Sequence, residues 1–241
     1  MNNERCDDPE QFDKEVAVVC EYYAAAFELY QQGEHIVSTD EKTGIQALER
    51  KYPSLPMKPG LVERREFEYI RHGTQVLIAN FEIATGKLIS PFIGATRTEA
   101  DFLAHISRTI EVDPDGVWVF IVDQLNTHKS ESLVRLVAER CGIETDLGLK
   151  DKSGILKSMP TRAAFLQDPS HRIRFVYTPK HTSWLNQIEI WFSILVRRVL
   201  KRGTFTSVDH LRDRILAFID YFNQTMAKPF KWTYAGRPLT V

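Results

Sequence analysis

Residues 117–122 read Val-Trp-Val-Phe-Ile-Val, and Asp123 follows this apolar run directly. A short run that is apolar at every position is typical of a strand buried on both faces of an α/β sheet. Ligands of open α/β sheets bind beyond the carboxyl ends of the strands, which is where Asp123 lies. A carboxylate at this place is costly to bury unless it is paired or binds a metal, although it also suits the cap of a turn. The position alone leaves both interpretations open.

Strand and helix patterns alternate on either side of this run. Residues 74–85 and 87–96 are rich in Val, Ile and Phe, and the Ala-Thr-Gly-Lys at their junction predicts a hairpin. A short strand over 35–39 is expected to end at Asp40, before a turn at Lys-Thr-Gly, and another strand is predicted over 173–177. Helices are predicted over 9–32, 98–110, 130–141, 183–201 and 207–222. This order favours an α/β protein with a mixed sheet and helices on both faces.

The composition is that of a folded globular protein. The chain of 241 residues carries 31 Lys and Arg against 32 Asp and Glu, and 43% of it is hydrophobic, which excludes a disordered or collagen-like chain. No apolar run approaches the roughly 20 residues that a bilayer-crossing helix needs, so we expect no membrane partner. The three cysteines are widely spaced, and the first residues do not resemble a signal peptide. Both observations favour a reducing, cytoplasmic location.

Three carboxylates lie beside predicted strand or helix ends, namely Asp40, Asp123 and Glu189. Oxygen ligands that converge from separate elements would bind a hard cation such as Mg²⁺. Taken singly, Asp40 equally suits the start of a turn, and Glu189 equally suits the exposed side of its helix. The segment 171–202 contains seven Lys and Arg residues, and Glu189 is its only acidic residue. The charge of the chain is thus segregated, and the last four basic residues of this segment, Arg197, Arg198, Lys201 and Arg202, suit either contact with DNA phosphates or a solvated helix end.

Two strings carry a resemblance to a known family. Residues 119–128 read Val-Phe-Ile-Val-Asp-Gln-Leu-Asn-Thr-His, and residues 177–192 read Tyr-Thr-Pro-Lys-His-Thr-Ser-Trp-Leu-Asn-Gln-Ile-Glu-Ile-Trp-Phe. They resemble the DDE transposases of the mariner superfamily, and most closely the bacterial insertion-sequence branch. In that family the second acid heads an Asp-Asn-x-x-x-His motif, and the third closes a Pro-x-x-x-x-x-Leu-Asn-x-x-Glu motif. The first acid often belongs to an Asp-Glu pair, which Asp40 and Glu41 match here.

The resemblance implies an RNase H-like fold, a mixed five-stranded sheet flanked by helices, over residues 34–205. Residues 1–33 would then be an N-terminal helix and linker, residues 206–241 a C-terminal helix and tail, and a stretch of about 143–170 an insertion. It also implies cleavage and joining of DNA strands at transposon ends with two Mg²⁺ or Mn²⁺ ions. Asp40, Asp123 and Glu189 would hold the two ions. The implied partners are transposon-end and target DNA and a second copy of the chain, in a bacterial cytoplasm with the protein at the nucleoid when bound to DNA.

Further residues receive secondary roles. Four are possible auxiliary groups of the site: Glu41, Asn126, His128 and Asn186. His128 would approach the metals or a phosphate, or else make a structural hydrogen bond. Six basic residues are expected to contact DNA phosphates without reading its sequence: Lys180, His181, Arg197, Arg198, Lys201 and Arg202.

The chain departs from the family pattern in three ways. Gln124 stands where the family usually has Asn, and the interval from Asp123 to Glu189 is longer than usual. Only one helix is predicted before Asp40, so we expect the family's helix-turn-helix region, which reads the transposon ends, to be missing from this chain. The alternatives are therefore another RNase H-like nuclease, or a non-catalytic DNA-binding remnant of a transposase. A glycoside hydrolase with paired carboxylates would leave the basic segment unexplained.

Overall fold

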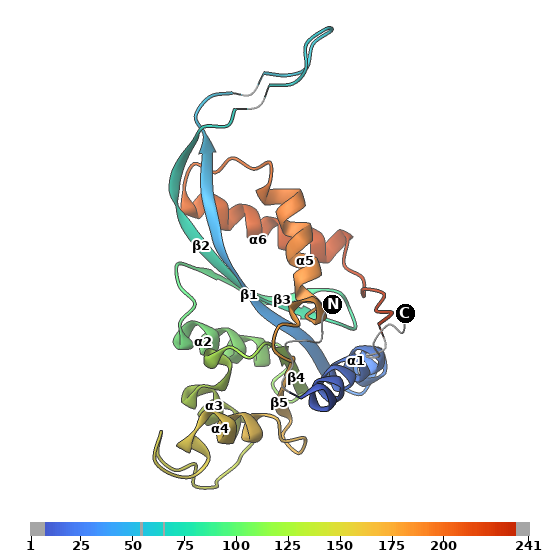
Figure 1. Cartoon of the computed structure of the whole chain (residues 1–241), viewed down its shortest axis with the longest axis vertical. Coiled ribbons are helices and arrows are strands. Elements are labelled where there is room, and N and C mark those ends of the chain that lie inside the picture. The colour runs from blue at the N-terminus through green and yellow to red at the C-terminus, as the bar shows by residue number, and fades with distance from the viewer. Residues whose placement is uncertain (1–7, 54, 65, 235–241) are drawn as a thin grey trace.

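The structure is a computed structural model that describes residues 8–53, 55–64 and 66–234. Its centre is a five-stranded sheet with the strand order β3-β2-β1-β4-β5 (Figure 1). The strands β1, β4 and β5 are parallel to one another, whereas β2 is antiparallel to both β1 and β3. Their bounds are β1 Glu34–Arg50, β2 Tyr69–Glu82, β3 Leu88–Gly94, β4 Val117–Val122 and β5 Ile173–Tyr177. The predicted mixed sheet of five strands is confirmed.

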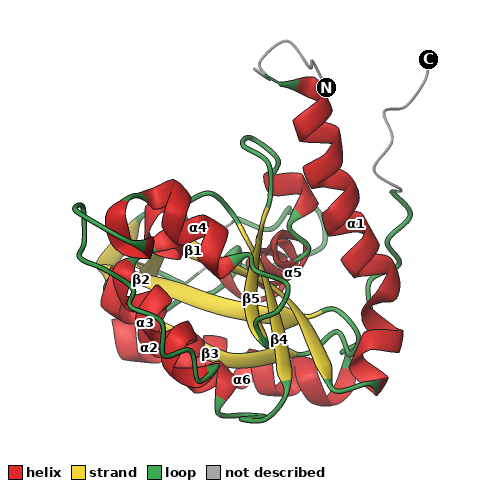
Figure 2. Ribbon diagram, turned by 90° about the horizontal axis from the view of Figure 1, so that it is seen from below, coloured by secondary structure: helices red, strands yellow, loops and turns green. Residues whose placement is uncertain are grey.

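Helices cover both faces of this sheet (Figure 2). One face packs against α1 (Pro9–Gln31), α5 (Ile188–Leu195) and α6 (Val208–Thr225), and the other against α2 (Glu99–Ile110), α3 (Glu131–Arg140) and α4 (Met159–Leu166). Successive residues of β4 alternate between the two cores, because Val119 and Ile121 lie in the first core and Phe120 and Val122 in the second. This alternation explains why the run 117–122 is apolar at every position.

Capping side chains fix the starts of three helices where the sequence predicts them. Thr98 and Asp101 form a capping box at the start of α2. Ser130 accepts the N–H of Leu133 at the start of α3, and Ser207 caps α6 in the same way. Among the described residues no helix is both long and apolar enough to cross a membrane.

The first strand is longer than predicted. β1 does not end at Asp40 but continues to Arg50, and the Lys-Thr-Gly expected to form a turn is a bulge within the strand. Gly44 supplies the positive φ of this bulge, 68°, which a residue without Cβ adopts at low cost. Pairing with β2 on both sides of the bulge overrides the local turn signal. The long connection between β1 and β2 extends away from the body (Figure 1).

The helix predicted over 183–201 is interrupted. A 3₁₀ turn at Ser183–Leu185 is followed by Asn186 in an extended conformation, with φ −81° and ψ 109°. α5 then begins at Ile188, and a π-helical turn at Val196–Leu200 ends it. The prediction was wrong here because the apolar periodicity of this stretch hides the break at Asn186, whose side chain is bonded to β1.

The stretch of about 143–170 contains structure that the sequence did not predict. A 3₁₀ turn at Ile155–Lys157 precedes α4, and the side chains of Leu156 and Leu166 are fully buried. The guanidinium of Arg162 donates hydrogen bonds to the carbonyl oxygens of Lys129 and Leu156, at 2.8 and 3.0 Å. Arg162 thus ties the stretch to the 3₁₀ turn Asn126–Lys129, and α4 also packs against α3 and β5, even though the sequence of this stretch has no clear periodicity.

Candidate active site

Asp40 and Asp123 line the same cavity, which has a volume of about 340 Å³. Asp40 lies within β1 and Asp123 directly follows β4. The two strands are parallel neighbours in which Ser38 pairs with Ile121, and each aspartate comes two residues after its strand's member of that pair. The register of the sheet therefore brings the two carboxylates together. The rest of the lining comes mainly from residues 124–125 and 178–183, with Asn186.

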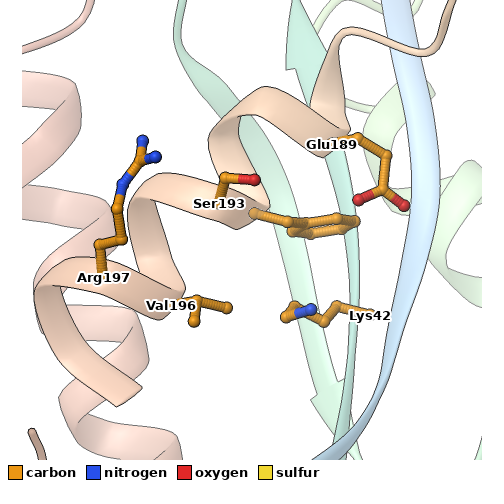
Figure 3. A pocket seen from close by; sticks show the side chains of 6 residues that line it. Lys42, Glu189, Ser193, Val196 and Arg197 are labelled. Carbon is orange, nitrogen blue, oxygen red and sulfur yellow. The ribbon is translucent and has the colours of Figure 1, made fainter. Parts of the chain in front are cut away.

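Glu189 lies in the first turn of α5 and lines a second cavity, of about 230 Å³ (Figure 3). The other lining residues are Lys42, Phe192, Ser193, Val196 and Arg197. Figure 3 shows the carboxylate of Glu189 and the side chain of Lys42 facing this pocket. Lys42 also lies over the ring of Phe192, with its Nζ 5.7 Å from the ring centroid. The third carboxylate thus opens onto a pocket that contains positive charge as well.

The pKa of Asp40 is raised by burial and by the other acidic side chains nearby. Burial raises the pKa of Asp40 to about 7, in spite of a 2.7 Å hydrogen bond from the backbone N–H of Glu41. The negative charges of Asp123, Glu41 and Glu189 add to this rise. A buried carboxylate surrounded by like charges is unfavourable unless it takes up a proton or a cation. In the part of the chain that the structure describes, however, no three His, Cys, Asp or Glu side chains lie close enough together to coordinate one metal ion.

His128 joins two of the acidic residues. Its Nδ1 lies 2.9 Å from an Asp123 carboxylate oxygen and its Nε2 lies 3.0 Å from a Glu41 carboxylate oxygen. The side chain of His128 is fully buried, and that of Glu41 is only 3% exposed. Burial alone would lower the pKa of His128, but the hydrogen bonds to Asp123 and Glu41 outweigh it and raise the pKa to about 9. His128 is therefore a buried cation between two carboxylates, and the same contact keeps the pKa of Asp123 low although burial opposes it.

Asn186 links Asp40 to α5. Its side chain is buried, and its Nδ2 donates to the carboxylate of Asp40 at 3.2 Å and to the carbonyl oxygen of Thr39 at 3.1 Å. Its Oδ1 accepts a short hydrogen bond from Ser38. Three of the four predicted auxiliary residues, Glu41, His128 and Asn186, thus contact a predicted acid or its neighbours. The fourth, Asn126, is exposed on the 3₁₀ turn Asn126–Lys129.

The basic residues predicted to bind DNA lie around these two cavities. Lys180 and His181 are exposed and line the cavity of Asp40 and Asp123. Arg197 lines the cavity of Glu189, and Arg198 is exposed on the same π-helical turn. Two further predicted residues, Lys201 and Arg202, are exposed directly after that turn. The exposed positive charge therefore follows the end of α5 beyond Glu189.

Sequence reasoning missed two lysines near the carboxylates. Lys42 lies in the pocket of Glu189, and Lys129 is bonded to the side chain of Gln124, a lining residue of the other cavity. Gln124 in turn donates to the carbonyl oxygen of Thr178 at 2.9 Å, so the residue that departs from the family pattern is held in place. Lys129 directly follows His128, so its place near the site could have been predicted from the sequence. Lys42 could not, because it belongs to the Lys-Thr-Gly that was expected to form a turn.

Comparison with known proteins gives a family. The family model described as "DDE superfamily endonuclease" matches residues 35–212, which is well over half of the chain. No curated protein is similar enough to the chain to count as a match.

Several solved structures of the Mos1 mariner transposase share the fold. A Mos1 paired-end complex with Mn matches with a TM-score of 0.52 and 13% identity, over 88% of this chain and 56% of that one. A Mos1 strand transfer complex matches with a TM-score of 0.50 and 12% identity, over 88% of this chain and 55% of that one. The catalytic domain of Mos1 matches with a TM-score of 0.50 and 10% identity, over 89% of this chain and 83% of that one. At these identities the likeness shows the RNase H-like fold, and the chain spans little more than half the length of the first two.

Proposed function

Because the chain belongs to the DDE superfamily endonucleases, we propose that it is the catalytic domain of a DNA transposase. It would cleave and join DNA strands at transposon ends by metal-dependent phosphoryl transfer. The observation that carries this proposal is the placement of Asp40 and Asp123 side by side in one cavity, with Glu189 close enough to raise the pKa of Asp40. We assign residues 34–205 to the catalytic core.

The donor set suits divalent metal ions. We propose that Asp40, Asp123 and Glu189 hold two Mg²⁺ or Mn²⁺ ions, because hard cations prefer carboxylate oxygens and the buried carboxylate of Asp40 lies among the like charges of Asp123, Glu41 and Glu189. When bound, a pair of ions supplies activation of the attacking oxygen and charge stabilisation of the leaving oxygen in an in-line displacement. A Mos1 complex that shares this fold was crystallised with Mn, which supports the choice of ion.

Other side chains of the chain would hold these carboxylates and the substrate. Asn186 orients the carboxylate of Asp40 through its Nδ2, and His128 orients that of Asp123 through its Nδ1. Lys180 and His181 would contact phosphates at the cavity of Asp40 and Asp123. A second group would contact the flanking duplex and consists of Arg197, Arg198, Lys201 and Arg202. Since transposition brings two DNA ends together, we further propose that a homodimer forms on the DNA.

Manganese binding tests the proposal without needing a cognate DNA sequence. We expect isothermal titration calorimetry to show that the unaltered chain binds Mn²⁺ and that Asp123→Asn abolishes binding. Asp115→Asn is the matched control, because Asp115 is an exposed aspartate in the turn before β4, and it should bind as the unaltered chain does. Equal binding by Asp123→Asn and Asp115→Asn would refute the metal site. A folded unaltered chain that binds no Mn²⁺ would favour the non-catalytic DNA-binding remnant.

A further inference from the structure

The helix that carries Glu189 begins without a cap from its own sequence. Gln187, at the N-cap position of α5, makes no side-chain hydrogen bond to the helix. The first N–H groups of a helix have no partner within it, and when buried they must find one elsewhere. Here the N–H of Ile188 donates to the hydroxyl of Ser38, at 2.9 Å, and the N–H of Gln187 donates to the hydroxyl of Tyr23, at 3.4 Å. Side chains of β1 and α1 thus replace the missing cap.

Tyr23 holds this turn at two points. Its hydroxyl also donates to the carbonyl oxygen of Leu185, at 2.9 Å, so that one oxygen atom bridges the residues on either side of Asn186. The side chain is buried, and its ring packs edge-on against Trp232 with the centroids 5.1 Å apart. Burial raises the pKa of Tyr23 far above its ordinary value, although the N–H of Gln187 opposes the rise, so the hydroxyl keeps the proton that it donates.

The turn that Tyr23 holds is connected to two of the proposed metal ligands. On one side Asn186 donates to the carboxylate of Asp40. On the other side the backbone of residues 186–190 enters α5, where the N–H of Glu189 donates to the carbonyl oxygen of Asn186 at 3.1 Å. A shift of this turn would therefore move Glu189 relative to Asp40.

We propose that Tyr23 is a positioning residue for Glu189, which makes α1 an integral part of the carboxylate site. This inference rests on the proposed function, because it takes Glu189 to be a metal ligand. Tyr23 does not contact a carboxylate of the site. It acts through the turn of residues 185–187, in the way that outer partners of metal ligands fix the geometry of the ligands themselves.

Tyr23→Phe removes one oxygen atom and keeps the buried ring. The matched control is Tyr22→Phe, since Tyr22 precedes Tyr23 on α1 and its hydroxyl accepts a 3.4 Å hydrogen bond from Arg174, away from the turn. Both variants would be compared with the unaltered chain below their melting temperatures. The first readout is amide hydrogen exchange, by mass spectrometry, of peptides that cover residues 185–192. The second is the affinity for Mn²⁺ by calorimetry, with Glu189→Gln as the reference for loss of the ligand.

We expect Tyr23→Phe alone to speed exchange of this segment by roughly tenfold, the factor that corresponds to loss of about one hydrogen bond. We also expect it to weaken Mn²⁺ binding by about 10- to 100-fold. Unchanged exchange in Tyr23→Phe would overturn the inference. So would an unchanged Mn²⁺ affinity in Tyr23→Phe while Glu189→Gln abolishes binding, because Tyr23 would then be merely structural. If the unaltered chain binds no Mn²⁺, the proposed metal site fails, and exchange alone decides whether Tyr23 holds the turn.

Discussion

The buried cation His128 gives the sharpest prediction about stability. His128→Phe keeps a ring of similar size beside Phe102, whose centroid lies 4.3 Å from that of His128. The substitution removes the charge and both hydrogen bonds, and among the described residues Glu41 then keeps an ion pair with Arg97, which is 3.8 Å away and half exposed. Removing one partner of a buried ion pair typically costs about 3–5 kcal/mol, since the other charge stays buried. We expect a loss of that size in the free energy of unfolding.

A second His–Glu pair in the same protein provides the control. His72 Nε2 lies 2.6 Å from a Glu49 carboxylate oxygen, closer than the corresponding atoms of His128 and Glu41, but these side chains are 28% and 32% exposed. Water solvates the glutamate that remains, so His72→Phe should cost below about 1 kcal/mol. Urea unfolding followed by circular dichroism measures both variants. The reasoning is wrong if His72→Phe costs as much as His128→Phe.

The double variant Glu41→Met, His128→Phe separates the buried charge from the packing. Replacing both partners of a buried pair by apolar residues of similar volume is often neutral or stabilising. We therefore expect the double variant to be more stable than His128→Phe alone. A double variant that is less stable than the single one would show that packing around the ring, and not the charge left on Glu41, dominates the cost.

Three further predictions concern the turns, the pH dependence and DNA binding. Gly86 has φ 70°, and a Cβ there would lie 2.1 Å from the carbonyl oxygen of Lys228, whereas Gly33 has φ 84° and open space around the position of a Cβ. Gly86→Ala should therefore lower the melting temperature far more than Gly33→Ala. Equal losses would contradict this prediction. Burial alone would lower the pKa of His35, but its hydrogen bonds to Glu82 and Asp113 raise that pKa above 6.5, so the proton stabilises the folded state. This stabilisation is complete below pH 6.5 and is lost as the pH rises through the folded pKa, and urea unfolding over this range should show a weaker pH dependence in His35→Gln. If the exposed Arg198 contacts a DNA phosphate, Arg198→Ala should reduce the slope of log affinity against log salt concentration by about one, as measured by fluorescence anisotropy with duplex DNA. Arg214 is an exposed arginine of α6 and provides the control. The same reduction in Arg214→Ala would show that the effect comes from net charge and not from a contact of Arg198.

The sequence predicted those elements whose signal lies within the element itself, such as an apolar run or a capping residue. The run 117–122 is apolar at every position because β4 contributes to both cores, and Thr98 and Ser207 cap the helices that follow them. β1 beyond Asp40 could not be predicted in this way. Its Lys-Thr-Gly has the composition of a turn, and only the pairing with β2 turns it into a bulge.

The three candidate acids could be named from the sequence, but the residues that hold them in place could not. Asp40, Asp123 and Glu189 follow from their positions and from the family motif, whereas the partners that fix them come from distant parts of the chain. Ser38 and Tyr23 form hydrogen bonds with residues 185–188 across 150 to 164 positions of sequence, and no periodicity or spacing reveals such contacts. The start of α5 was mispredicted for the same reason. The N–H groups of Gln187 and Ile188 donate to Tyr23 and Ser38, so no capping residue next to the helix marks where it begins.

The position of bound manganese tests the central claim most directly. We expect anomalous diffraction from crystals grown with Mn²⁺ to show manganese coordinated by the carboxylates of Asp40, Asp123 and Glu189. Manganese bound elsewhere, or none in crystals where these three carboxylates are well ordered, would contradict the assignment of the chain as a metal-dependent transposase core.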